Sequence, residues 1–86
     1  MASYKIIIKK SAAKELSGIP KKDLPRIIKR IQSLTDNPRP AGSEKLAVQE
    51  CYRIRQGNYR VIYIIDDINL TIDIFKIGHR REVYRF

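Results

Sequence analysis

Three β-rich runs separated by two short turns fill most of the second half of this 86-residue chain. Residues 51–55, 59–65 and 70–77 are rich in isoleucine, tyrosine and other residues that favour strands. A Gly-Asn pair at 57–58 lies in the first turn, and an Asp-Asp-Ile-Asn segment at 66–69 forms the second. Consecutive strands joined by such short turns predict an antiparallel meander.

The first half of the chain predicts one strand and two helices. Residues 4–9 contain three consecutive isoleucines flanked by lysines, which indicates a short outer strand. Ser11 is a candidate N-cap for a short helix that ends at Gly18. A second helix is predicted over about 21–34, because five apolar residues recur there at helical spacing. These residues are Leu24, Ile27, Ile28, Ile31 and Leu34.

The order of these elements predicts an α+β fold. The segment 36–43 contains two prolines and a glycine, so it separates the helices from the meander. A further short strand is predicted over 44–48. The chain then reads as one strand, two helices and three or four antiparallel strands, with both helices packed on one face of the sheet. Residues 1–86 are expected to form one domain, and the other face of its sheet is left available for a partner.

Positive charge is the strongest signal in the composition. Eighteen Lys and Arg residues against nine Asp and Glu residues give a formal net charge of +9. Residues 1–43 carry ten basic and three acidic residues, and residues 44–86 carry eight and six. Such an excess attracts polyanions through counterion release, and nucleic acid is the commonest of them. Any single lysine on the second helix is equally well explained as part of a solvated face.

Several classes of protein are disfavoured by the composition. With Cys51 as the single cysteine and one histidine, the chain has no internal disulfide and no metal-ligand cluster, so neither a metal nor another cofactor is expected. No apolar run approaches the roughly 20 residues that span a bilayer, and no signal peptide is visible. We therefore expect a cytoplasmic protein that does not act at a membrane. Cys51, Tyr52, Tyr59 and Tyr63 are expected to pack within the sheet.

The hairpin around Gly57 concentrates arginine. If its turn has two residues, Arg55 faces Arg60, and Arg53 lies on the same face because side chains alternate along a strand. Directly opposed like charges destabilise a hairpin, and a bound phosphate would relieve that repulsion. A three-residue loop would instead send Arg60 to the other face.

The end of the chain adds further polar groups. Gly78 is expected to end the last strand and to present His79, Arg80 and Arg81 at its edge. Tyr84 offers a phenol and a ring on which an unstacked base can lie. Each has an ordinary explanation when taken alone, since histidines are mostly surface residues and Arg81 can pair with a nearby carboxylate.

Two segments together resemble the RelE/ParE toxin superfamily. Residues 51–63, read as Cys-Tyr-Arg-Ile-Arg-Gln-Gly-Asn-Tyr-Arg-Val-Ile-Tyr, resemble its signature hairpin, and residues 77–84 resemble the ending of its RelE branch. The order of strands and helices matches as well, so the resemblance covers nearly the whole chain. It implies a ribosome-dependent endoribonuclease that cuts mRNA, silenced by a RelB-like antitoxin in a toxin–antitoxin hetero-oligomer.

The resemblance also implies the site residues. Basic residues of the family's hairpin match Arg53, Arg55 and Arg60, of which the first two replace lysines of the best-known member. The family's ending has an arginine and a tyrosine where this chain has Arg80 and Tyr84. The implied catalytic residues are Arg60, Arg80 and Tyr84, and the implied substrate-binding residues are Arg53, Arg55, His79 and Arg81.

The expected chemistry is attack of an RNA 2′-OH on the adjacent phosphate, with arginines neutralising the developing charge. Arginine stays protonated near neutral pH, so the role of base is left to Tyr84, with His79 as the reserve. Arg60 and Arg80 are expected to be exposed charges. Two residues follow Tyr84, whereas some relatives continue into a C-terminal helix. We therefore expect an antitoxin either to cover the arginines directly or to neutralise their charge with an acidic segment.

Two other functions remain open on the sequence. A ParE-type toxin shares the fold but binds DNA gyrase, and the combination of Arg80 with Tyr84 favours the RNA-cleaving branch over it. A noncatalytic nucleic-acid-binding module would be served equally well by the basic charge.

Overall fold

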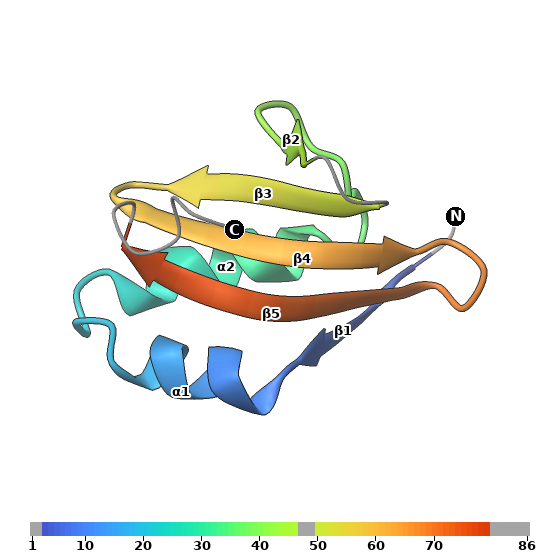
Figure 1. Ribbon diagram of the computed structural model, residues 1–86. Helices are drawn as coiled ribbons and strands as arrows, with labels where there is room; N and C mark the ends of the chain where they lie inside the picture. Colours follow the sequence, from blue (N-terminus) through green and yellow to red (C-terminus); the bar gives the residue numbers. More distant parts are fainter. Residues whose placement is uncertain (1–2, 47–49, 80–86) are drawn as a thin grey trace.

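The structure is a computed structural model that describes residues 3–46 and 50–79 of the chain. In this part of the chain five strands form one mixed sheet, in the order β1-β5-β4-β3-β2, and two helices lie on one of its faces (Figure 1). The strands are β1 (Lys5–Ile8), β2 (Glu44–Lys45), β3 (Cys51–Gln56), β4 (Tyr59–Asp66) and β5 (Thr71–His79), and the helices are α1 (Lys10–Ser17) and α2 (Leu24–Ser33). The predicted α+β class, with helices on one face, is confirmed.

The sheet is larger than the predicted meander. Strands β2 to β5 are antiparallel neighbours in chain order, as predicted, but β1 joins the sheet as well, parallel to β5. The sheet is therefore five-stranded and mixed rather than a meander of three or four strands. The pairing of residues 5–8 with residues 71–74 joins distant segments, so no local turn signal announces it. The predicted outer position of the first strand is confirmed, because β1 is an edge strand.

The first helix begins earlier than predicted. The residue before α1 is Lys9, which makes no side-chain cap hydrogen bond, and Ser11 lies within the first turn. The prediction of Ser11 as the N-cap is therefore wrong. The backbone N–H of Lys9 donates to the carbonyl oxygen of Ile74 at 2.9 Å, and this contact with β5 fixes where the strand ends and the helix begins.

The second helix begins later than predicted. Residues 21–23 form a turn in which the N–H groups of Asp23 and Leu24 both donate to the carbonyl oxygen of Pro20, at 2.9 and 3.1 Å. α2 starts only at Leu24, with Pro25 in its first turn, where the missing N–H costs little. The lysines of the turn therefore lie outside the helix.

The main core lies between the helices and the sheet. Ile27, Ile31 and Leu34 of the predicted apolar stripe are buried, whereas Leu24 is half-buried and Ile28 is exposed. The sheet contributes the buried side chains of Tyr52, Ile54, Val61, Tyr63, Ile65, Ile72, Ile74 and Ile77.

A smaller apolar cluster lies apart from this core. It consists of Cys51 and Ile62, against which Leu46 and Phe75 pack. The expected burial of Cys51 is confirmed, and desolvation raises the pKa of its thiol above the usual value.

Across the two described ranges, no helix is long and apolar enough to cross a membrane.

Candidate functional site

A two-residue turn joins β3 to β4 and fixes the register of the hairpin. Gly57 occupies its first position with φ 60°, a left-handed conformation that glycine adopts without steric cost. The register pairs Gln56 with Tyr59 and Arg55 with Arg60. The predicted register is confirmed, and the three-residue alternative is excluded.

Three of the predicted site residues share the face of the sheet that the helices leave uncovered. Ile54 and Val61 pack into the core beneath the helices. Because side chains alternate along a strand, their neighbours Arg53, Arg55 and Arg60 point to the opposite face. We call these three residues the arginine face.

Arg60 lies at the centre of this face and is buried, with 7% of its surface exposed. It belongs to the central strand β4, between Arg55 on β3 and Gly78 on β5. Glycine contributes no side chain, which leaves room for a guanidinium beside it. The expectation that Arg60 is an exposed charge is therefore wrong. A guanidinium in this position interacts with an anion more strongly than one in bulk water, because the local dielectric constant is lower.

Glu44 of β2 orders the other two members of the arginine face. Arg53 Nη2 donates to Glu44 Oε2 at 2.8 Å, and Arg55 Nη2 lies 4.0 Å from Glu44 Oε1. The Arg53 side chain is 20% exposed and that of Arg55 is 62% exposed, so the second is available at the rim. One carboxylate beside two guanidiniums leaves this part of the face positive. Glu44 was not predicted, because its position depends on how β2 pairs with β3.

Gly78 and His79 are not placed as predicted. Gly78 does not end the last strand but lies within β5, paired with Arg60, since a backbone ladder needs no side chain. His79 is the last residue of β5, and its ring meets that of Tyr59 edge-on at 5.8 Å between centroids. Tyr59 packs against the core on the helix side. The structure therefore places His79 on the opposite face from the three arginines.

The remaining predicted site residues, Arg80, Arg81 and Tyr84, lie outside the described residues.

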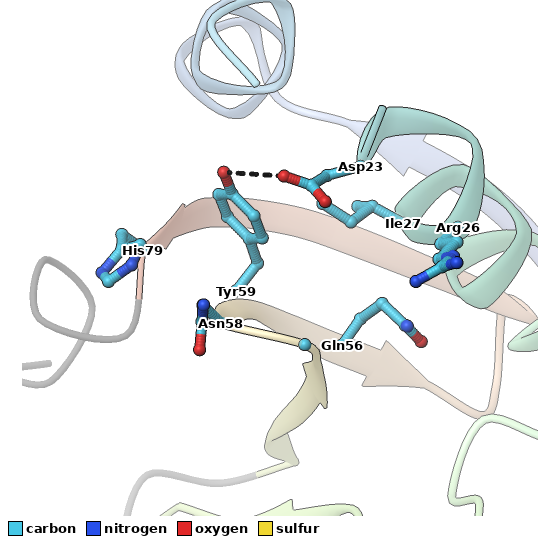
Figure 2. A pocket seen from close by; sticks show the side chains of 8 residues that line it. Asp23, Arg26, Ile27, Gln56, Asn58, Tyr59 and His79 are labelled. Carbon is cyan, nitrogen blue, oxygen red and sulfur yellow. Dashed lines mark hydrogen bonds between the residues drawn. The ribbon is translucent and has the colours of Figure 1, made fainter. Parts of the chain in front are cut away.

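A small polar cavity lies beside the Gly57 turn on the helix side of the sheet (Figure 2). Its volume is about 170 Å³. The hydroxyl of Tyr59 donates to Asp23 Oδ2 across it at 3.5 Å. The cavity is lined by Asp23, Arg26, Ile27, Gln56, Gly57, Asn58, Tyr59 and His79. These residues come from the start of α2, the β3–β4 turn and the end of β5. The sequence pointed to the turn and to His79, but not to their packing beside Asp23 and Arg26.

A second arginine cluster, centred on Arg39, lies at the other end of the sheet. Arg39 Nη2 donates to Asp67 Oδ2 at 2.8 Å and to Glu50 Oε2 at 3.1 Å, and its Nε donates to the Tyr52 hydroxyl at 3.0 Å. The Tyr4 hydroxyl donates to Asp67 Oδ1 at 2.6 Å. These contacts join the residue before β1, the 36–43 segment, the start of β3 and the β4–β5 turn. We call these residues the Arg39 cluster, and they too were not predicted.

The hydrogen bonds of the Arg39 cluster shift its titrations. The bond from Arg39 lowers the pKa of Asp67, and the bond from Tyr4 lowers it further. The pKa of Glu50 is lowered by Arg39 first and by Tyr52 second. Both carboxylates are thus held in the charged form that the guanidinium needs.

Comparisons with known proteins agree with the resemblance noted in the sequence. Residues 6–84 match the family described as the ParE toxin of the type II toxin–antitoxin system parDE. The chain is 30% identical over 84 residues to Toxin RelE of Mycobacterium tuberculosis, covering 95% of this chain and 87% of that one. It is 26% identical over 84 residues to Toxin RelG of the same organism, covering 95% and 97%.

The fold has a close structural counterpart as well. The archaeal RelE–RelB complex of Pyrococcus horikoshii OT3 contains a chain that superposes on this one with a TM-score of 0.79 and 28% identity. The match covers 91% of this chain and 96% of that chain.

Proposed function

Because the chain belongs to the RelE/ParE superfamily of toxins from type II toxin–antitoxin systems, we propose that it is a ribosome-dependent endoribonuclease that cleaves mRNA in the cytoplasm. The observation that carries this proposal is the arginine face. Arg53, Arg55 and Arg60 project from two paired strands onto the face of the sheet that the helices leave uncovered. Guanidiniums fixed in this way can bind a phosphodiester through paired N–H donors, which a flexible lysine cannot do.

The reaction is a transfer within the RNA strand. The 2′-oxygen attacks the adjacent phosphorus, the bond from phosphorus to the 5′-oxygen breaks, and the products are a 2′,3′-cyclic phosphate and a 5′-hydroxyl end. Arg60 and Arg80 stabilise the charge that develops on the phosphate oxygens. Arg53, Arg55 and Arg81 bind the flanking backbone.

In this mechanism the phenolate form of Tyr84 accepts the proton of the 2′-OH, and a proton from water converts the departing 5′-oxygen into the hydroxyl end. Arginine stays protonated at neutral pH, so the arginine face supplies no base. His79 is the other candidate, but its ring lies on the helix side with Tyr59. A site that neutralises charge but offers a weak base gains most from a substrate already held in line, which is what the ribosome would supply.

We assign a RelB-like antitoxin as the partner that silences the toxin. The related archaeal chain was solved as a RelE–RelB complex, which supports a hetero-oligomer of the same kind here. The helix-free face of the sheet carries excess positive charge around Glu44, so an acidic antitoxin segment would complement it. Covering Arg55 and Arg60 would block the phosphate.

The test is to map mRNA 5′ ends in a translating extract, with the wild-type protein and with Arg80→Ala. We expect new ends within codons, carrying a 5′-hydroxyl, that depend on ribosomes and are lost in the variant. Relaxation of DNA by gyrase inhibition without mRNA cuts would indicate the ParE-type activity instead. RNA binding with neither effect would indicate a noncatalytic module.

A further inference from the structure

Residues that line the polar cavity beside the Gly57 turn are sequence neighbours of Arg60 and of its ladder partner Gly78. Tyr59, which lines the cavity, directly precedes Arg60 in β4, and His79 directly follows Gly78, the ladder partner of Arg60. Side chains alternate, so the cavity and the arginine face lie on the two sides of the same end of the sheet. An RNA strand that crosses this end at the turn could touch both.

The size of the cavity suits one flat ring system. Pockets for drug-sized ligands have volumes of roughly 300–1,000 Å³, whereas this cavity has about 170 Å³. A whole nucleotide is too large for it, but a base alone needs much less space. The cavity lies beside the turn (Figure 2), and the base is the part of a nucleotide that its volume can hold.

The side chains around the cavity carry the hydrogen-bonding groups that read a base. Gln56 and Asn58 are amides, and each offers both donors and an acceptor. Asp23 offers carboxylate oxygens, and it does not cap α2 with its side chain. Single-stranded RNA is recognised by such groups along the edges of unstacked bases, with aromatic rings against their faces. The edge-on pair of Tyr59 and His79 supplies those rings.

A groove for the backbone adjoins the cavity. It has a volume of about 280 Å³, is lined by Arg26, Lys29, Arg30, Ser33 and Gln56, and shares two of these residues with the cavity. Within the described ranges, no carboxylate lies in ion-pair distance of Arg26, Lys29 or Arg30. Their charges remain available for phosphates, and each neutralised phosphate releases counterions.

We propose that this cavity is a nucleobase subsite, which holds one unpaired base of the RNA while the cations of α2 hold its neighbouring phosphates. The assignment builds on the proposed cleavage of RNA and adds a site of base selection to it. Asp23 accepts hydrogen bonds, so the subsite favours bases that carry an exocyclic amino group. Adenine, cytosine and guanine have such a group, and uracil lacks one.

The test is a titration of isotope-labelled full-length protein with each of the four ribonucleoside 5′-monophosphates. Binding is monitored through the NMR chemical shifts of the backbone amides. Ribose 5-phosphate is the control, because it has the phosphate but no base. We expect AMP, GMP and CMP to shift the amide signals of Gln56, Asn58 and Tyr59 in a saturable way. UMP should bind at least threefold more weakly, and ribose 5-phosphate should shift only residues along the groove.

Two matched pairs of variants identify the contacts. Asp23→Asn should remove the preference over UMP, whereas Asp36→Asn, which changes the charge equally but lines no described cavity, should retain it. Arg26→Gln should lower the affinity for all four nucleotides about threefold to tenfold, and Lys14→Gln on α1 should change these affinities much less. Gln56→Ala serves as a second cavity variant in case Asp23→Asn alters the start of α2.

Two outcomes would overturn the subsite. Either ribose 5-phosphate shifts the cavity amides as much as the nucleotides do, or the Asp23 and Asp36 variants show the same preference over UMP. Shifts confined to Arg53 and Arg55 would be a third such outcome. The titration needs neither ribosomes nor cleavage. If no base binds but mRNA is still cut, the subsite is wrong and the proposed function stands. If a base binds but mRNA is not cut, the subsite stands and the proposed function is wrong.

Discussion

The two arginine clusters at opposite ends of the sheet differ in how their charge is matched. Arg39 meets two carboxylates, Glu50 and Asp67, and also donates to a tyrosine hydroxyl. In the arginine face, one carboxylate, Glu44, is shared by Arg53 and Arg55. Within the described residues, Arg39 has two carboxylate partners, whereas Arg53 and Arg55 share one.

Under the proposed function, this difference separates a structural arginine from the ligand-binding ones. The contacts of Arg39 join three segments of the chain and satisfy its guanidinium within the fold. In the arginine face, Glu44 is the one described carboxylate paired with both Arg53 and Arg55, and directly opposed like charges on neighbouring strands cost stability. Arg55 opposite Arg60 is therefore better explained by an anionic ligand than by folding. Four changes can break or sharpen this contrast.

The largest effect is expected from Arg60→Ala. Removing a charge-stabilising donor from a phosphoryl-transfer site should lower cleavage by about 100-fold or more. Growth arrest on induction should be lost as well. Cleavage in a translating extract, scored by primer extension, measures the change.

Burial of Arg60 calls for a second variant. Truncation at a position with 7% exposure can also destabilise the fold, so thermal unfolding is measured alongside. Arg60→Lys keeps the charge but loses the planar, bidentate geometry, and we expect it to stay folded while remaining strongly impaired. Near-normal cleavage by Arg60→Ala would remove Arg60 from the catalytic residues.

Arg39→Gln should affect stability rather than cleavage. It removes the contacts with Glu50 and Asp67, and we expect a loss of about 1 kcal/mol, since the network is largely exposed. Urea unfolding at neutral pH gives the change. The folded fraction should cleave mRNA at the normal rate, and a specific loss of cleavage would contradict the division between the two clusters.

Glu44→Gln should strengthen RNA binding instead of weakening a function of the protein. Releasing Arg53 and Arg55 from their carboxylate leaves more positive charge for RNA, so affinity for a noncleavable single-stranded RNA should rise by about threefold. Fluorescence anisotropy at fixed salt measures it. The control is Asp73→Asn, which removes one negative charge from a different strand, β5. Weaker binding by Glu44→Gln would mean that Glu44 positions Arg53 for the ligand.

The smallest effect is expected in acid. The pKa values of Asp67 and Glu50 are lowered in the folded protein, so their stabilising contribution is complete above the ordinary carboxyl values of about 4. It is lost as the pH falls through the lower folded values. Unfolding from pH 6 to pH 2.5 should therefore show a shallower decline in Arg39→Gln than in the wild type. Parallel curves would contradict the assigned coupling.

The sequence predicted the hairpin and its arginines because local rules govern them. Gly57 suits a two-residue turn, and strand alternation then puts Arg53, Arg55 and Arg60 on one face. The resemblance to known toxins was also available in the sequence. Local rules were less reliable at the ends of elements. The predicted N-cap at Ser11 was wrong because the chain before α1 is held by β5, and the predicted strand end at Gly78 was wrong because Gly78 pairs with Arg60 of β4.

By itself, the sequence determined which segments become helices and strands, how the central hairpin pairs, and which three arginines gather on it. The tertiary structure decided that β1 lies parallel to β5, that Arg60 is buried beside Gly78, and that Glu44 and Arg39 meet their partners. The cavity around Tyr59 belongs to this second group. The physical reason is range: turns and alternation act between near neighbours in the chain, whereas burial, ion pairing and cavities depend on which distant segments pack together.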